Sequence, residues 1–167
     1  SRKRSLAALP LVIAHRGDSA HRPENTLASF AGALEVGATL VELDVQLTAD
    51  GHVVVLHAPT LDRTTSGRGE VRGLTLAQVR AVSAGYPSRF GTAYAGERVP
   101  TLGEVLALLR GRASALVERK SAAVTDDVLG GIEARVADEV RRAGMADQVA
   151  LISFDQRAVV RLLALAP

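Results

Sequence analysis

The sequence predicts a single α/β domain in which helices cover a mostly parallel sheet. Short apolar or β-branched runs of strand length alternate along the chain with segments whose apolar residues recur at helical spacing. The chain has 167 residues, the length of one domain, and 47% of them are hydrophobic while 23% are charged. This composition excludes a disordered or fibrous protein.

Composition also restricts the chemistry. The chain has no cysteine, so we expect any metal to be held by carboxylates and histidines, and oxygen ligands favour a hard cation. The net charge is only +2 and aromatic residues make up 3%, so the sequence lacks the basic face and stacking rings of a nucleic-acid-binding protein. No apolar run reaches the ~18 residues of a membrane span.

Five segments have the length and composition of strands. Each is a short apolar or β-branched run, which is typical of a strand buried in a sheet. They are residues 11–15, 39–45, 52–57, 114–120 and 148–153.

Helical patterns lie between these strands. The first has apolar residues at helical spacing from Leu27 to Leu34 and begins after a cap at Asn25 or Thr26. Two capping boxes predict the starts of two more helices, at Thr75 with Gln78 and at Thr101 with Glu104. A longer helix is expected over about 126–143 with Gly144 as its stop, and a last helix begins near Asp155 and includes Leu163.

Residues 58–100 break this alternation. They are rich in Gly, Arg, Thr and Ser and contain one short helical pattern. Because they follow the third strand, we interpret them as an excursion from the edge of the sheet where strands end, and long loops there often carry function.

Acidic side chains share one face of a strand. Glu42, Asp44 and Gln46 alternate with apolar residues, so they point the same way, and Glu118 and Lys120 do the same on a later strand. Neighbouring carboxylates repel unless a positive group lies between them, so the pattern favours a metal or a catalytic carboxylate pair. A solvated strand face and a structural Glu118–Lys120 pair are the alternatives.

Two histidines end strands. His15 closes the first strand and His57 the third, where they could serve as general acid and general base. His21 and His52 lie in a loop and a turn, and we expect both at the surface.

Specific motifs follow one another along the chain. They are IAHRG at 13–17, RPENT at 22–26, VELDV at 41–45, Asp50-Gly51, the run from His57 to Thr65, PTLGEVL at 100–106, Glu118 with Lys120, and SFD at 153–155. In this order they closely resemble the motifs of the glycerophosphodiester phosphodiesterase family, and the resemblance covers the chain from Leu11 onward.

The resemblance implies a TIM-type (β/α)8 barrel with its site at the carboxyl ends of the strands. Because such a barrel takes eight strands and about 250 residues, we expect residues 1–167 to be the N-terminal part of the catalytic domain, with only about the first five β/α units present. A second chain that supplies the rest is the alternative. Residues 58–100 would be an insertion above the barrel that shapes the substrate pocket.

The resemblance also implies metal-dependent hydrolysis of glycerophosphodiesters to glycerol 3-phosphate and an alcohol. Glu42, Asp44 and Glu118 would bind one divalent cation, Mg²⁺ or Ca²⁺. His15 and His57 would be the catalytic acid and base. The attacking group, either the glycerol 2-hydroxyl or water, stays open.

Four further residues receive supporting roles from the resemblance. Arg16 and Lys120 would hold phosphate oxygens, and Glu24 and Asn25 would support the loop that follows the first strand. The remaining alternatives are a phospholipase D-like hydrolase of lysophospholipids or sphingolipids and a non-catalytic phosphate-binding relative.

Two departures from the family pattern accompany these roles. Ala58 stands where relatives commonly have an Asp after the second histidine, which removes a hydrogen-bond partner near His57. Arg119 stands where an apolar residue would face the helices, so it must snorkel or meet an acid.

The expected partner is a small-molecule phosphodiester, with no nucleic acid and no membrane span, and the oligomeric state stays open. We expect a cytoplasmic protein, with secretion or a periplasmic location as the alternative because Arg2, Lys3 and Arg4 precede an apolar run.

Overall fold

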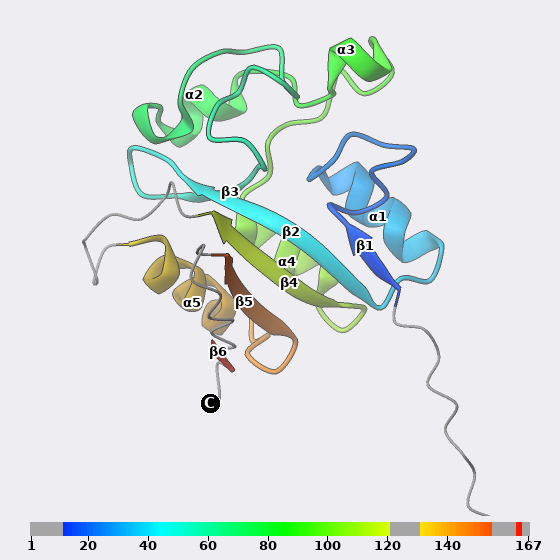
Figure 1. Cartoon of the computed structure of the whole chain (residues 1–167), viewed down its shortest axis with the longest axis vertical. Coiled ribbons are helices and arrows are strands. Elements are labelled where there is room, and N and C mark those ends of the chain that lie inside the picture. The colour runs from blue at the N-terminus through cyan, green and yellow to red at the C-terminus, as the bar shows by residue number, and fades with distance from the viewer. Residues whose placement is uncertain (1–11, 121–130, 155–162, 165–167) are drawn as a thin grey trace, which may run out of the picture.

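The structure is a computed structural model that describes residues 12–120, 131–154 and 163–164. It consists of a mostly parallel sheet with helices packed against it (Figure 1), so the expected α/β class is confirmed. Its elements are, in chain order, β1 (Ile13–His15), α1 (Leu27–Glu35), β2 (Leu40–Leu47), β3 (Val53–Val55), the 3₁₀ helix η1 (Val71–Gly73), α2 (Leu76–Arg80), α3 (Pro87–Phe90), α4 (Leu102–Leu109), β4 (Ser114–Lys120), α5 (Ile132–Arg142), β5 (Val149–Phe154) and β6 (Leu163–Ala164).

β2 is the centre of the sheet. It pairs in parallel with β1 and with β4, and β4 pairs in parallel with β5. In the ladder between β2 and β4, Asp44 lies opposite Glu118. The parallel order places the carboxyl ends of these strands at one edge of the sheet.

The two faces of β2 have different neighbours. Val41, Leu43 and Val45 are fully buried and belong to one apolar core with α1, α4 and α5. Because side chains alternate along a strand, Glu42 and Asp44 point to the opposite face. The apolar half of the strand therefore holds the helices, and the polar half is presented to the candidate site.

The predicted helix starts are confirmed. The hydroxyl of Thr26 accepts a hydrogen bond from the backbone N of Ser29 (3.2 Å), which makes Thr26 rather than Asn25 the cap of α1. Both predicted capping boxes are present, at the starts of α2 and α4. The predicted long helix is observed as α5 with Gly144 at φ +66° after its end, while residues 121–130 lie outside the described residues.

The third strand differs from the expected alternation, because β3 runs antiparallel to β2. Only residues 48–52 connect the two strands, and this is too short for the crossover that a parallel pair requires. The backbone N of Thr48 donates to the carbonyl of His52 (2.9 Å), and Gly51 has φ +82°. β2 and β3 are therefore a hairpin.

The last predicted helix is wrong at Leu163. Leu163 and Ala164 form β6, and Leu163 pairs antiparallel with Leu151 of β5. Pairing satisfies the backbone groups of an edge strand, which outweighs the helical spacing of the apolar residues. The other part of that expected helix, residues 155–162, lies outside the described residues.

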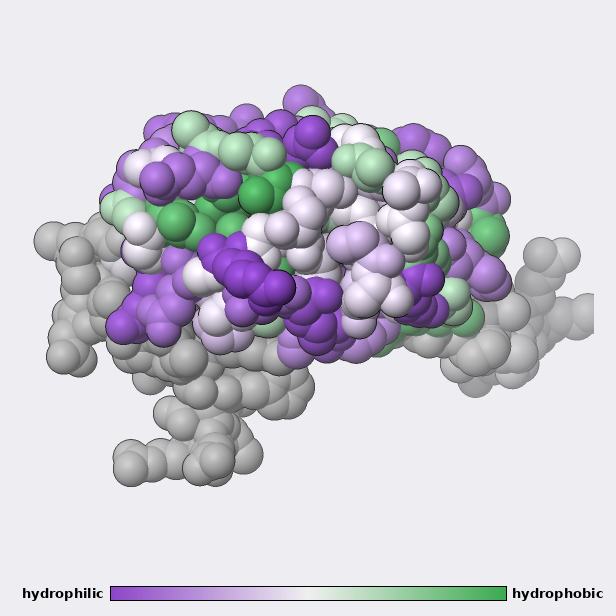
Figure 2. Space-filling view, turned by 90° about the horizontal axis from the view of Figure 1, so that it is seen from above, coloured by the Kyte–Doolittle hydropathy of each residue, from purple (hydrophilic) through white to green (hydrophobic). Residues whose placement is uncertain are grey.

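Residues 58–100, called the excursion below, lie above the carboxyl ends of the strands, at the top of Figure 1. The excursion contains η1, α2 and α3 rather than one short helix. Figure 2 looks down on this face and shows hydrophilic residues over much of it beside a smaller hydrophobic area. Under that surface lies a second apolar core, formed by Val54, Leu56, Leu61, Val71, Val79, Ala84 and Val99.

Among the described residues, none of the helices combines the length and the apolar character needed to cross a bilayer.

Candidate active site

Three carboxylates predicted from the strand pattern meet at the carboxyl ends of β2 and β4. Glu42, Asp44 and Glu118 each offer an oxygen, and these oxygens all lie within 4.8 Å of one another. The parallel ladder explains the grouping, because Asp44 and Glu118 are register partners and Glu42 lies one pleat earlier.

The cluster is short of positive charge. Burial, together with the nearby carboxylates of Asp44 and Glu118, raises the pKa of Glu42 to about 8. One oxygen of Glu42 (Oε1) and one of Asp44 (Oδ1) are buried and have no hydrogen-bond partner among the described residues. Unpartnered carboxylate oxygens at this spacing are the ligands that a hard divalent cation takes, so the residues fit such an ion.

The first loop, residues 16–26, brings Arg16 to the acids. The backbone N of Arg16 donates to Glu42 Oε2 (3.2 Å), and its side chain makes ion pairs from Nε to Asp44 Oδ2 (3.2 Å) and from Nη1 to Glu24 Oε2 (2.6 Å). Arg16 has φ +57°, a left-handed conformation that is unusual for a residue with a Cβ. The loop therefore accepts backbone strain where it aims this guanidinium.

Asn25 closes the same loop against Asp44. Its side-chain Nδ2 donates to Asp44 Oδ2 (3.0 Å), and its backbone N donates to the carbonyl of Arg16 (3.0 Å). Asn25 also has a positive φ of +57°, which asparagine tolerates better than most residues. Gly17, the residue after Arg16, has φ +80°. A Cβ at this position would lie 2.7 Å from the carbonyl carbon of Ser29, so only glycine fits.

Glu24 is buried between two arginines. Burial alone would raise the pKa of Glu24, but hydrogen bonds from Arg63 and Arg16 hold this pKa below its ordinary value. Arg63 comes from the excursion and pairs with Glu24 Oε1, while Arg16 pairs with Oε2. The sequence did not single out Arg63, because no periodic pattern surrounds it.

His15 lies beside the acids. Its Nε2 is 3.5 Å from Glu42 Oε2, and its side chain is 60% exposed. Solvent can therefore reach a proton on this ring, as a group that exchanges protons requires.

His57 is positioned in a different way from the one expected. It follows β3, which runs antiparallel, so it does not lie at the carboxyl end of a parallel strand. The hairpin instead places His57 beside β2. Gln46 Nε2 donates to the carbonyl of His57 (3.1 Å), and the backbone N of Leu56 donates to the carbonyl of Asp44 (3.0 Å). His57 as a residue is partly buried.

The other two histidines are exposed, as predicted. His21 Nδ1 lies 2.8 Å from Asp18 Oδ1, and His52 Nδ1 lies 3.4 Å from Asp50 Oδ1. Both pairs belong to surface turns.

At the end of β4, the structure places the backbone of Lys120 opposite Phe154, and the position of its side chain lies outside the description. Arg119 points to the other face and its Nη2 lies 3.1 Å from Glu133 Oε1 of α5. Of the two expected outcomes for Arg119, snorkelling or meeting an acid, the structure thus shows the second.

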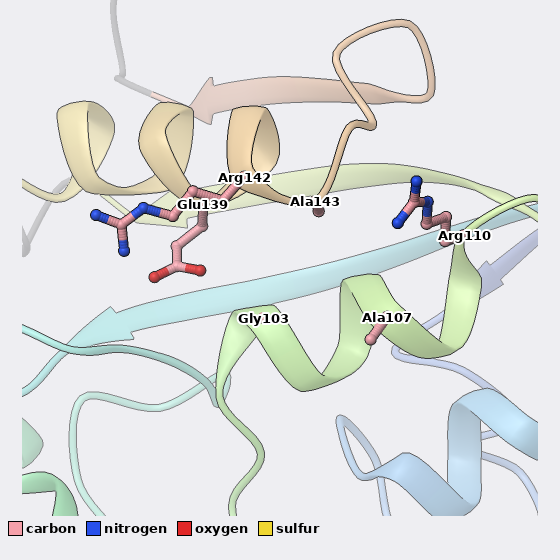
Figure 3. Close-up of a pocket in the computed structure, with 6 residues that line it drawn as sticks. All are labelled: Gly103, Ala107, Arg110, Glu139, Arg142 and Ala143. Carbon is pink, nitrogen blue, oxygen red and sulfur yellow. The ribbon is translucent and has the colours of Figure 1, made fainter.

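A separate hollow lies between α4 and α5, in the helical layer (Figure 3). It is lined by Gly103, Ala107, Arg110, Glu139, Arg142 and Ala143. Arg142 is already paired with Asp138 at 2.9 Å. The hollow shares no residue with the carboxylate cluster.

The parallel strands, with helices on one face and polar side chains gathered at the carboxyl ends, correspond to part of a TIM-type (β/α)8 barrel. A solved structure of glycerophosphodiester phosphodiesterase from Agrobacterium tumefaciens is similar with a TM-score of 0.76 and 37% identity, over 87% of this chain and 58% of that one. An Oleispira antarctica phosphodiesterase, solved with the product sn-glycerol-3-phosphate, has a TM-score of 0.75 and 35% identity, over 88% of this chain and 58% of that one.

Sequence comparison agrees. The family model for the glycerophosphoryl diester phosphodiesterase family matches residues 15–167, so the chain belongs to this family. A glycerophosphodiester phosphodiesterase of Caldanaerobacter subterraneus is 43% identical over 94% of this chain and 63% of its own length. One from Bacillus subtilis is 35% identical over 94% of this chain and 56% of its own. The chain thus spans about three fifths of the curated relatives it matches.

Proposed function

We propose that the intact protein hydrolyses glycerophosphodiesters to glycerol 3-phosphate and an alcohol with the help of one divalent cation. The observation that carries this proposal is the cluster of Glu42, Asp44 and Glu118. Two of these residues keep a buried oxygen that no group in the described part of the chain binds by a hydrogen bond. A histidine and an arginine lie against the cluster, so a cation, a proton carrier and an anion-binding group meet in one place.

Glu42, Asp44 and Glu118 hold the cation in this proposal, and Mg²⁺ or Ca²⁺ suits their oxygen atoms. When bound, the cation polarises the phosphoryl group and offsets the charge of the diester. Asn25 keeps Asp44 oriented through its side-chain amide.

His15 and His57 move the protons. One deprotonates the attacking group, either the glycerol 2-hydroxyl or water, and the other protonates the leaving alkoxide, which removes the need for a covalent protein nucleophile. They come from different elements, β1 and the segment after β3, so they can approach the diester from separate positions.

Arg16 and Lys120 bind phosphate oxygens. A guanidinium can bind two oxygens in a fork, whereas an ammonium acts as a point charge. Glu24 orients Arg16 by pairing with its Nη1 (2.6 Å). The excursion covers the site from above and shapes the pocket for the alcohol half of the diester.

The test is turnover by the intact protein of glycerophosphocholine, glycerophosphoethanolamine and lysophosphatidylcholine, with and without Mg²⁺ or Ca²⁺. We expect metal-dependent release of glycerol 3-phosphate from the first two. Turnover of lysophosphatidylcholine alone indicates the phospholipase D-like activity instead. Binding without turnover of any diester indicates a non-catalytic relative, for which Ala58 is the motivating departure.

A further inference from the structure

Two arginines of the excursion reach back to the first loop. Arg63 pairs with the buried carboxylate of Glu24, which also binds Arg16 at 2.6 Å. Arg89 donates to the backbone carbonyls of residues 19–20, at 2.8 and 3.0 Å. The excursion therefore holds the first loop at two points, and only the contact of Arg63 passes through the residue that orients Arg16.

The backbone around Arg63 is fixed in place. Leu61 is 2% exposed, and Thr64 and Thr65 are buried. The hydroxyl of Thr65 donates to the carbonyl of Leu61 (2.5 Å), and the N of Tyr86 donates to the carbonyl of Thr64 (3.0 Å). A side chain that starts from a fixed backbone can hold its partner in one geometry.

An aromatic ring also orients the Arg63 side chain. Its guanidinium carbon lies 5.7 Å from the centre of the Tyr86 ring, and its Nη1 donates to the Tyr86 hydroxyl at 3.4 Å. Tyr86 packs edge-on against Phe90 (6.2 Å between ring centres), and Phe90 against Tyr94 (5.5 Å). These three residues are most of the five aromatic residues in the chain, so the aromatic rings are concentrated around Arg63.

Glu24 is a bridge in which each oxygen has its own arginine. Oε1 pairs with Arg63 and Oε2 with Arg16. Because Glu24 is 92% buried, water cannot readily replace a lost arginine. Without Arg63 the carboxylate can turn, and Arg16 can then move toward Asp44, its other partner at 3.2 Å.

We propose that Arg63 is a positioning residue for phosphate binding: through Glu24 it fixes the guanidinium of Arg16 and links the seating of the excursion to the affinity for the diester. The inference rests on the proposed function in one respect, that Arg16 binds a phosphate oxygen.

The experiment measures binding of sn-glycerol 3-phosphate by calorimetry and steady-state kinetics with glycerophosphocholine, both on the intact protein. Arg63→Ala should weaken binding and raise KM by about 10- to 100-fold, the usual cost of misplacing a binding group, with a smaller change in kcat. Arg63→Lys should restore part of the loss, because it keeps the charge without the fork. Arg68→Ala is the matched control, since Arg68 is 85% exposed and 3.9 Å from its acidic partner, and it should resemble wild type.

A double-mutant cycle with Glu24→Gln separates positioning from general destabilisation. In the Glu24→Gln background, where no carboxylate bridges the two arginines, Arg63→Ala should weaken ligand binding by less than about twofold. If the two residues acted independently, Arg63→Ala would weaken binding there as much as it does in the wild type. If Arg63→Ala fails to fold, Arg63→Gln replaces it in the double-mutant cycle. Additive losses, or wild-type affinity in Arg63→Ala, overturn the inference. Wild-type protein that binds the ligand without turnover contradicts the proposed function alone, and protein that does not bind it contradicts both.

Discussion

The sheet and the loops above it contribute different side chains to the candidate site. β2 and β4 supply the carboxylates, while the first loop supplies Arg16 and the excursion supplies Arg63. The sheet is held by ladder hydrogen bonds and the larger apolar core, whereas the excursion combines a smaller apolar core with bonds from side chains to backbone, such as that of Thr65. The difference teaches that the proposed metal ligands belong to the sheet and the arginines to the loops, so substitutions can perturb each half of the site separately.

The largest expected effect tests whether both halves are needed for proton transfer. His15 belongs to the sheet and His57 to the hairpin that leads into the excursion. Each replaced by Ala should lower turnover by ~10² to 10⁴, the usual range for a general acid or base. Both variants should still bind the metal, and calorimetry measures this binding.

His21→Ala and His52→Ala are the controls for this experiment, because both side chains are exposed and paired with acids in surface turns. Both should stay close to wild-type turnover. A large loss in either control, with none in His15→Ala, would show that the wrong pair was chosen.

The second prediction removes charge from the sheet. With a cation at 100 times its dissociation constant, the free energy of unfolding should rise by about 2.7 kcal/mol. Glu42→Gln and Asp44→Asn should lose most of this rise, measured by thermal melting with Mg²⁺ or Ca²⁺. Glu70→Gln, at an exposed position in the excursion, is the control and should keep it.

The Glu42→Gln variant also gives a test of pH dependence in the absence of metal. The folded-state pKa of Glu42 is about 8, above its ordinary value of 4.5, so ionising it destabilises the metal-free protein increasingly between these pH values. Glu42→Gln should therefore melt above wild type at pH 8 and not at pH 4. Equal melting temperatures at both pH values, together with an unchanged metal response, would contradict the carboxylate cluster as a cation site.

A smaller effect is expected where a loop residue supports the sheet. Asn25 donates to Asp44, and loss of a group that orients a metal ligand typically costs about 10- to 100-fold in metal affinity. We expect this cost for Asn25→Ala and for Asn25→Gly, measured by metal titration. Glycine removes the amide but accepts the positive φ, so wild-type affinity in Asn25→Gly would attribute the effect to backbone strain and not to the amide.

The smallest effect concerns a contact of the excursion far from the acids. Burial alone would raise the pKa of Glu104, but hydrogen bonds from Arg80 and Thr101 hold it below 4.5. The stabilisation is therefore complete above pH 4.5 and is lost as the pH falls through the lowered folded-state value. Both side chains of the Arg80–Glu104 pair are about one third exposed, so Glu104→Gln should cost at most about 1 kcal/mol.

Urea unfolding at pH 7 and pH 3 measures this difference. We expect wild type and Glu104→Gln to differ at pH 7 and to converge at pH 3. A difference that is the same at both pH values would show that the effect does not come from the charge of Glu104, since a glutamine keeps the capping box.

The sequence was most informative about β2. Its apolar and acidic residues alternate, so period two predicted both the strand and the direction of Glu42 and Asp44. The capping boxes likewise predicted where α2 and α4 begin, because the cap residues contact their own helix. In each case the signal and the structure it determines lie within a few residues of one another.

Features that depend on distant contacts were harder to predict. A run such as Val53–Val55 has no direction in its composition, and only the short connection to β2 reveals that it runs antiparallel. Arg63 meets Glu24 only because two loops fold over the same sheet edge, and nothing beside either residue indicates the other. Leu163 fits a helical spacing, yet the edge of β5 determines its conformation.

The turn at residues 48–52 determines how the chain tolerates insertions and deletions. Asp50 accepts a hydrogen bond from the backbone N of Leu76 (2.9 Å), and Arg135 of α5 donates to the carbonyl of Gly51 (2.8 Å), so the turn is tied on two sides. One added residue would shift the pairing of β3 and turn its side chains to the other face. Length should therefore vary freely near Gly96, where the chain is exposed and an added Cβ meets open space, but not in this turn.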